Sequence, residues 1–276
     1  MDATDLKLTK DVNDSIVKNG YEFLRELCAF NADINSFTKN LNPISNRVEY
    51  IMHQLDAQNI TYKVDKFQPL IGTPDFVEGQ PAEVNIIVEF EGNNKEATTV
   101  FTSHHDVANR ASENAQDNSA SVSNLLDLCV QLSKERPANN VVVCFNDSEE
   151  RVSTTTSGAA RISKQILAKE YGNVTKILVL ELTGNGRNYW MSFYRSNMEN
   201  KPQIRRVRTP FSDTATFETH NLPSICIGSL SEGDMDNVIR RGFCRTWALC
   251  HSENDKFENA NEGDMTAFVL FLKTLI

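Results

Sequence analysis

One polar connection in the chain, FTSHHDVANRASENAQDNSAS at residues 101–121, carries two adjacent histidines, two aspartates and a glutamate. It begins as an apolar, β-type run and ends where a helical pattern starts, and it holds no apolar cluster that would bury these side chains. Imidazole suits zinc, and carboxylates commonly complete the ligand set of zinc and other divalent ions. These residue types therefore indicate a metal site.

Side chains of the same kinds follow other apolar runs. Glu149 and Glu150 come after VVVCFNDS, Glu181 closes KILVLE, and WALC runs into His251, with Asp255 four residues later. Ligands of α/β proteins gather beyond the carboxyl ends of the parallel strands, so a shared site is expected there. Each residue alone also has an ordinary explanation: a helix N-cap for Asp117, a solvated loop for the glutamate pair and a structural role for His251.

Adjacent carboxylates at one strand end can perform two different tasks, because neighbouring side chains on a strand point in different directions. One of Glu149 and Glu150 can bind metal while the other faces a reacting water. Two ions about 3.5–4 Å apart need a bridging carboxylate and activate a water between them.

Alternating helical and strand patterns must position these residues. Helical spacing of apolar residues occurs over 15–30, 44–58, 118–135, 157–172 and 261–276, with a helix expected to start at Asp117. Strand patterns occur over 60–68, 84–92, 98–106, 139–150, 174–186 and 222–230. The alternation predicts an α/β fold: a single domain whose mixed, largely parallel sheet is flanked by helices. We expect residues 1–60 to form an N-terminal helical part and residues 61–276 to hold the sheet and the metal site.

Bulk properties narrow the class of protein. The chain has 276 residues, a formal charge of −9 and a pI of about 5.1, which argues against non-specific nucleic-acid binding. Its apolar runs are too short to span a membrane, and its polar start does not resemble a secretory signal. The six cysteines include no C-x-x-C pair, so reduced, mostly buried thiols and a cytoplasmic location are expected.

The order of the motifs resembles that of the M28 zinc exopeptidases, the co-catalytic aminopeptidases and their relatives. Their pattern is H-x-D, D-N-x-S-G opening a helix, E-E, an acidic residue before x-x-G, and a late histidine. This chain has HHD at 104–106, DNSAS at 117–121, EE at 149–150, ELTG at 181–184, SDTATF at 212–217 and HSENDKFEN at 251–259. The resemblance extends from about Val84 to the C-terminus and implies a three-layer fold of the zinc-exopeptidase type.

The resemblance also implies a role for each matching residue. It makes His104 and Glu181 ligands of two different ions, with Asp117 as the bridge. Glu150 and His251 would complete the two ligand shells, and up to two zinc ions would bind. Glu149 would be the general base, and Asp106 would orient the site from behind the ligands. By the same comparison, His105 is not a ligand.

Two departures from the family pattern bear on activity. Glu181 stands where aminopeptidases often have aspartate, and Cys250 stands where many relatives have a tyrosine that resembles an oxyanion stabiliser. A thiol is a weak hydrogen-bond donor, so it replaces a phenol poorly.

The implied function is that of a zinc aminopeptidase acting on peptides with a free N-terminus, independent of membranes and nucleic acid. Alternatives on the same scaffold are a carboxypeptidase, an amide deacylase or a glutaminyl cyclase. A non-catalytic assembly protein that retains the peptidase fold is the alternative from another class. The oligomeric state and any assembly partner are left open.

Overall fold

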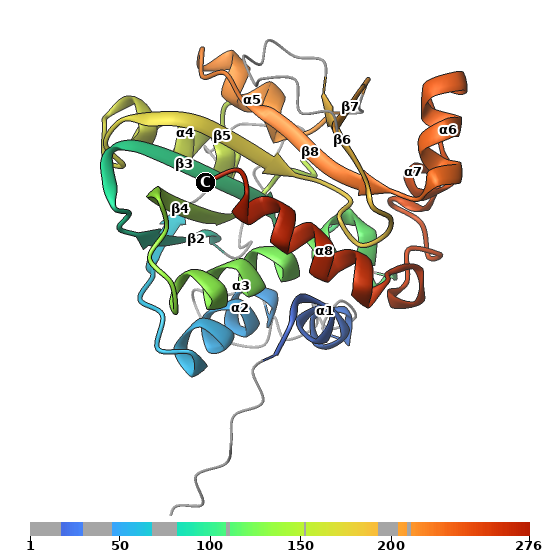
Figure 1. Ribbon diagram of the computed structural model, residues 1–276, viewed down its shortest axis with the longest axis horizontal. Helices are drawn as coiled ribbons and strands as arrows, with labels where there is room; N and C mark the ends of the chain where they lie inside the picture. The colour runs from blue at the N-terminus through green and yellow to red at the C-terminus, as the bar shows by residue number, and fades with distance from the viewer. Residues whose placement is uncertain are drawn as a thin grey trace, which may run out of the picture.

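The computed structural model describes residues 18–29, 46–67, 82–108, 111–151, 153–192, 204–208 and 211–276. Within these ranges eight strands form one mixed sheet in the order β1-β2-β4-β3-β5-β8-β6-β7 (Figure 1). The strands are β1 (Lys63–Phe67), β2 (Glu83–Phe90), β3 (Asn94–His104), β4 (Asn139–Asn146), β5 (Val174–Leu180), β6 (Asn188–Ser192), β7 (Ile204–Val207) and β8 (Ile225–Leu230). The four central strands, β4, β3, β5 and β8, run parallel to one another.

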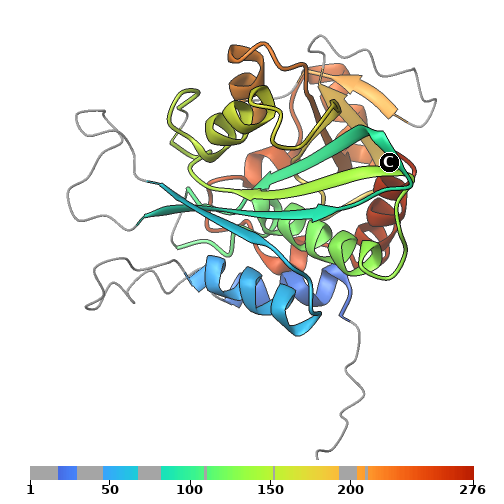
Figure 2. The same cartoon turned by 90° about the vertical axis from the view of Figure 1, so that its left-hand side faces the viewer.

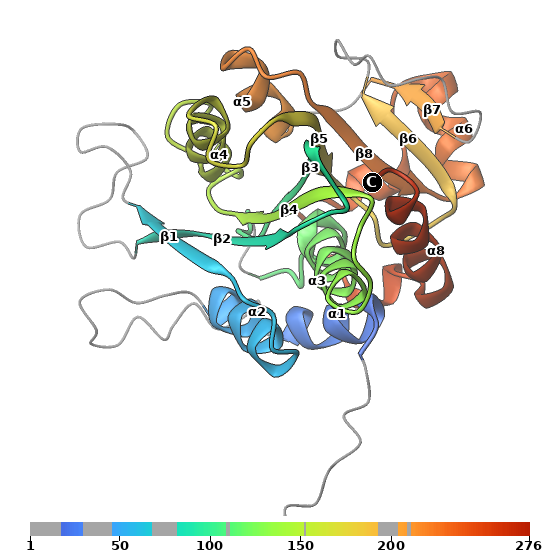
Figure 3. The ribbon, with the colours of Figure 1, turned by 60° about the vertical axis from the view of Figure 1, so that its left-hand side comes forward.

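Helices cover both faces of the sheet (Figure 3). On one face lie α1 (Gly20–Ala29), α2 (Asn46–Ala57), α3 (Ala120–Leu132) and α8 (Glu262–Lys273). The opposite face carries α4 (Gly158–Leu167) and α5 (Asp213–Thr219), and Figure 2 shows α4 in yellow-green across the sheet from the blue N-terminal helices. Two further helices, α6 (Glu232–Arg241) and α7 (Arg245–Leu249), precede the last histidine of the sequence.

The apolar side chains of the central strands alternate between the two faces, as the period of two along a strand requires. In β4, Val143 and Phe145 pack in the core beneath α3, while Val142 and Cys144 pack in the core beneath α4. Such a strand is buried on both sides, which explains its uninterrupted apolar run. The predicted fold class, an α/β domain with a mixed sheet flanked by helices, is confirmed, whereas the predicted boundary near residue 60 stays a prediction.

Three local features differ from the sequence expectations or were absent from them. The successive strands β2 and β3 are not neighbours, because β4 lies between them, antiparallel to β2 and parallel to β3. The helix expected to start at Asp117 starts at Ala120, after an irregular turn over Ala115–Ser119. The short elements β6, β7, α5, α6 and α7 were not predicted.

The cysteines agree with the expected reduced state. All six are free, and only Cys250 is not fully buried. Among the described residues, no helix is both long and apolar enough to cross a lipid bilayer.

Candidate metal centre

The candidate residues lie at the carboxyl ends of three adjacent parallel strands. His104 is the last residue of β3, Glu149 and Glu150 follow β4, and Glu181 directly follows β5. Asp117 lies in the irregular turn between β3 and α3, and His251 follows α7 from a distant part of the sequence. Parallel strand order brings His104 and the three glutamates together, and the segment after α7 adds His251, 147 positions after His104 by number.

The first group of potential ligands consists of His104, Asp117 and Glu181. The Nε2 atom of His104 lies 3.4 Å from Asp117 Oδ1 and 3.5 Å from Glu181 Oε2. All three residues are buried. Asn118 orients Glu181, because its side-chain amide donates to Glu181 Oε2 at 2.7 Å and to the carbonyl of Leu180 at 2.8 Å.

The second group consists of Asp117, Glu150 and His251. The Nε2 atom of His251 lies 3.2 Å from Asp117 Oδ2 and 3.1 Å from Glu150 Oε2. The side chain of His251 is 59% exposed, in contrast to 1% for His104. The second group is therefore open to solvent at His251, while all three residues of the first group are buried.

The two groups share Asp117, whose two carboxylate oxygens face different histidines. This arrangement matches the bridging role implied by the family resemblance, which stays a prediction. The resemblance also assigned His104 and Glu181 to different ions, whereas the structure places them in one group of potential ligands, so the ion that each would bind stays a prediction. Both belong to the first group, because β3 and β5 are neighbouring parallel strands that end beside each other.

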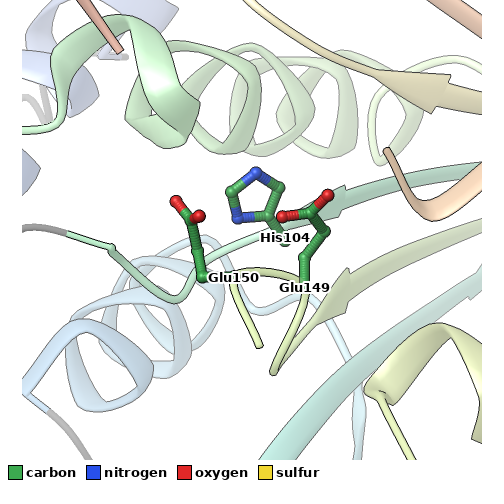
Figure 4. A group of neighbouring side chains, drawn as sticks. All are labelled: His104, Glu149 and Glu150. Carbon is green, nitrogen blue, oxygen red and sulfur yellow. The ribbon is translucent and has the colours of Figure 1, made fainter. Parts of the chain in front are cut away.

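Glu149 and Glu150 extend on either side of the His104 imidazole ring (Figure 4). With His104 they form a third group that could hold an ion. Glu149 is only 8% exposed, and burial raises its pKa well above the ordinary value, although the neighbouring His104 opposes this shift. Its carboxylate is thus able to accept and retain a proton inside the site.

Asp106 contacts both strand ends from behind the ligands. Its Oδ1 lies 3.4 Å from His104 Nδ1, and its two oxygens accept the backbone N–H groups of Glu149 at 3.2 Å and Glu150 at 3.0 Å. His105 lies in none of the three groups, and its Nε2 lies 2.8 Å from the carbonyl oxygen of Val84. The geometry is therefore consistent with an orienting Asp106 and a structural His105.

Asp255 holds the turn that carries Asp117. Its carboxylate accepts the N–H of Gln116 at 2.8 Å and that of Asp117 at 3.0 Å, and its side chain is fully buried. These contacts fix the start of the turn, ahead of the non-helical residues Asp117 and Asn118. The sequence signals Asp255 only by its spacing from His251.

Asp213 is a buried carboxylate that the sequence interpretation left without a role, although it lies in the quoted SDTATF motif. It begins α5, accepts a hydrogen bond from the Asn146 side chain, and its Oδ1 has no hydrogen-bond partner among the described residues. Burial raises the pKa of Asp213 to about 7, and the charge of Glu181 contributes to the increase. Neither its position in the sequence nor its spacing from the predicted ligands distinguishes it from a surface residue.

Cys250 contributes a thiol close to the shared carboxylate. Its Sγ donates to the carbonyl oxygen of Thr246 at 3.6 Å, and burial raises the pKa of the thiol, with a further increase from the charge of Asp117. The thiol is thus neutral near pH 7 and already has a backbone acceptor.

The residues present fit a divalent ion. Within each group the ligand atoms lie within 4.8 Å of one another, and Glu181 Oε1 is buried without a hydrogen-bond partner among the described residues. Converging buried carboxylates repel one another, and a cation between them removes that cost. Oxygen and imidazole donors together are a set that zinc accepts.

Protonation of the metal-free ligands leads to a testable result. Burial raises the pKa of Glu150 to about 7, and the hydrogen bond to Asp117 raises that of His251 to about 9. Ligands bind metal in their deprotonated form, so ion binding at neutral pH should release protons, and affinity should increase as pH rises towards about 9. Calorimetric titration with zinc in two buffers of different ionisation enthalpy measures this release. Equal apparent enthalpies in both buffers would contradict it.

Gly228 in β8 gives a second prediction, because it lets the strand approach Glu181 closely. A Cβ atom there would lie 2.0 Å from the backbone oxygen of Glu181 and 2.5 Å from Cζ2 of Trp190. Gly228→Ala should therefore lower the free energy of unfolding by about 1–3 kcal/mol and weaken metal binding. Urea denaturation and metal titration measure the two effects. Gly233→Ala in α6 is the matched control, since nothing lies within 4 Å of its added Cβ, and it should be neutral or stabilising.

The fold is that of metallohydrolases of the zinc-exopeptidase type. The sequence model described as Peptidase family M28 matches residues 85–274, more than half of the chain. The chain therefore belongs to peptidase family M28. A comparison with curated protein sequences gives no match.

Solved structures with the same fold include proteins of more than one activity. A glutaminyl cyclase from Bacteroides thetaiotaomicron, bound to N-acetylhistamine, has a TM-score of 0.68 and 14% identity, covering 94% of this chain and 96% of its own. A leucine aminopeptidase precursor from the same species has a TM-score of 0.68 and 14% identity, with coverage of 94% and 95%. A Zn-dependent exopeptidase from Parabacteroides distasonis has a TM-score of 0.62 and 15% identity, with coverage of 93% and 96%. At these identities the similarity establishes the fold alone.

Proposed function

We propose that this protein is a zinc-dependent aminopeptidase that removes N-terminal residues from peptides. The observation that carries the proposal is the sharing of Asp117 between two ligand groups, with the carboxylate of Glu149 next to His104. A shared carboxylate is what a pair of closely spaced ions requires. Membership of peptidase family M28 and the fold similarity to an aminopeptidase precursor and a Zn-dependent exopeptidase support this choice.

Each residue of the site would have a distinct task. His104, Asp117 and Glu181 would hold one zinc ion, and Asp117, Glu150 and His251 would hold a second. Bound zinc supplies Lewis acidity, which polarises the substrate carbonyl and lowers the pKa of water. Glu149 would take the proton from the attacking water and return it to the leaving amine.

The N-terminal ammonium group of a peptide fits the charge of the site. The site collects the carboxylates of Glu149, Glu150, Asp117, Glu181 and Asp213, while its exposed side is the one that carries His251. Carboxylates that do not bind an ion can receive the ammonium group. A substrate without that charge would lose this contact, which favours action at free N-termini.

A glutaminyl cyclase is the second candidate, because a glutaminyl cyclase and an aminopeptidase precursor resemble this chain with equal TM-scores. In that reaction the α-amine of an N-terminal glutamine attacks its own side-chain carboxamide, a ring C–N bond forms, and ammonia leaves. Glu149 could carry the proton from the α-amine to the departing ammonia. Both candidate reactions need a free N-terminus.

One peptide set separates the candidates. With a peptide that begins with glutamine, the proposed aminopeptidase releases free glutamine and a shortened peptide, whereas a cyclase releases ammonia and leaves the peptide bonds intact. N-acetylation of the same peptide should abolish the reaction, and mass spectrometry follows all the products. Cleavage of acetylated and free peptides at equal rates would contradict the proposal and favour an amide deacylase.

A further inference from the structure

A buried arginine from the N-terminal helical part lies against the metal centre. Arg47 is in the first turn of α2, before the segment that the family sequence model matches, and it is only 5% exposed. The desolvation of a buried guanidinium is costly, so its position needs compensating contacts. Burial lowers its pKa to about 10, partly offset by the charge of Asp106, so the side chain remains charged at neutral pH.

Two contacts of Arg47 lead to the segments that carry the ligands. Its Nε donates to the backbone oxygen of His105 at 2.7 Å, and its Nη2 donates to the hydroxyl of Ser119 at 3.0 Å. His105 separates His104 from Asp106 in the sequence, and Ser119 lies two residues after Asp117. One side chain therefore joins the end of β3 to the turn that carries the shared carboxylate.

The turn needs such support because it is not a regular helix. Asp117 has φ −115° and ψ 88°, and Asn118 has φ −132° and ψ 31°, both outside the helical region. Asp255 holds the start of the turn through the N–H groups of Gln116 and Asp117. Arg47 reaches its last residue, Ser119, and ties it to the neighbouring ligand segment.

The chemistry of the side chain suits this task. A guanidinium presents several N–H donors in a rigid plane, so it can hold two acceptors from different segments at a fixed separation. A lysine keeps the charge but donates from a single nitrogen on a flexible stem. A methionine keeps much of the volume and donates nothing.

We propose that Arg47 is a positioning residue that sets the separation between His104 and the shared carboxylate Asp117. It acts through the carbonyl of His105 and the hydroxyl of Ser119 and does not touch the substrate. This inference rests on the proposed function, because it assigns α2 a part in the same metal centre. Loss of an interaction behind the ligands typically lowers metal affinity by about 10–100-fold.

The test compares metal binding by wild-type protein, Arg47→Met and Arg47→Lys. Zinc affinity is measured by competition with a chromophoric chelator, and the geometry of the site is measured from the visible absorption spectrum of bound Co²⁺. We expect Arg47→Met to bind zinc about 10–100-fold more weakly and to change the Co²⁺ spectrum. The zinc affinity of Arg47→Lys should lie between those of Arg47→Met and wild type.

Arg161→Met is the matched control, because it removes another arginine whose Nε donates to Asp65, at 2.7 Å, between α4 and β1. It should lower stability without changing zinc affinity or the Co²⁺ spectrum. If Arg47→Met lowers thermal stability but binds both ions as wild type does, the inference is overturned. If Arg47→Met does not fold, Arg47→Lys decides the test. An Arg47→Lys variant with the zinc affinity and Co²⁺ spectrum of wild type would also overturn the inference. A wild-type protein that binds neither ion contradicts the proposed function itself.

Discussion

Replacing Glu149 with glutamine is expected to lower kcat by about 10²–10⁴-fold, the usual contribution of a general base. Glutamine keeps the size of the side chain but cannot accept the proton of the attacking water. Both ligand groups that share Asp117 remain complete in this variant, since Glu149 belongs to neither. Zinc content and substrate binding should therefore stay close to wild type. Peptidase kinetics and elemental analysis of the same preparation measure the two quantities.

Glu150→Gln is the matched comparison, because the two glutamates are adjacent and flank the same histidine (Figure 4). Glu150 Oε2 lies 3.1 Å from His251 Nε2 in the exposed ligand group, so loss of its charge should weaken metal binding. Excess zinc should partly restore the activity of Glu150→Gln and leave Glu149→Gln inactive. If instead Glu149→Gln loses its metal and Glu150→Gln keeps it, the two roles are exchanged.

Asp117→Asn is expected to have the largest effect on metal binding of any single substitution in the site. Its carboxylate contacts both histidines, at 3.4 Å and 3.2 Å, and belongs to both ligand groups. Burial disfavours the charged form of Asp117, yet its hydrogen bonds to the two histidines hold its pKa below the ordinary value. Removing that charge should weaken the binding of both ions. The loss should exceed the about 10–100-fold decrease in metal affinity that is typical when a contact behind the ligands is lost.

The control for Asp117→Asn is Asp127→Asn, another buried aspartate a little further along the chain. Asp127 accepts the backbone N–H of Gly20 at 3.0 Å and lies in none of the ligand groups. The Asp127→Asn variant should lose some stability and bind zinc as wild type does. Equal zinc affinity in Asp117→Asn and Asp127→Asn, measured by chelator competition, would show that Asp117 does not bind metal.

The fold class and the place of the site could be predicted because the central strands carry a strong signal. A strand buried on both faces needs a continuous apolar run, as in β4, and parallel strands end at one edge. The polar residues after β3, β4 and β5 therefore had to converge. The membership of family M28 that the motif order indicated is confirmed by the match over residues 85–274.

The order of the strands could not be predicted in the same way. Local patterns indicate that β2 and β3 are strands, but the insertion of β4 between them depends on contacts distant in sequence. The proximity of His104 and Glu181 was missed for a related reason. Only the pairing of β3 with β5 shows that His104 and Glu181 share a group.

The supporting roles of Arg47, Asp213 and Asp255 could not be predicted from the sequence, although both aspartates lie within the quoted motifs. Arg47 lies 57 positions before His104 by number and carries no local pattern that separates it from a surface arginine of an amphipathic helix. Asp213 and Asp255 are short acidic residues at a helix start and in a loop, where solvated aspartates are common. Their burial becomes evident only when the segments are placed around the sheet.

We expect one set of side chains to form a centre for divalent metal ions: His104, Asp117, Glu150, Glu181 and His251. Zinc titration of the purified wild-type protein at neutral pH, followed by dialysis and elemental analysis, tests it most directly, with His104→Ala and His251→Ala beside it. We expect the wild-type protein to retain up to two zinc ions per chain and each histidine variant to retain less. A wild-type protein that retains no zinc after this treatment would show that these residues do not form a metal centre.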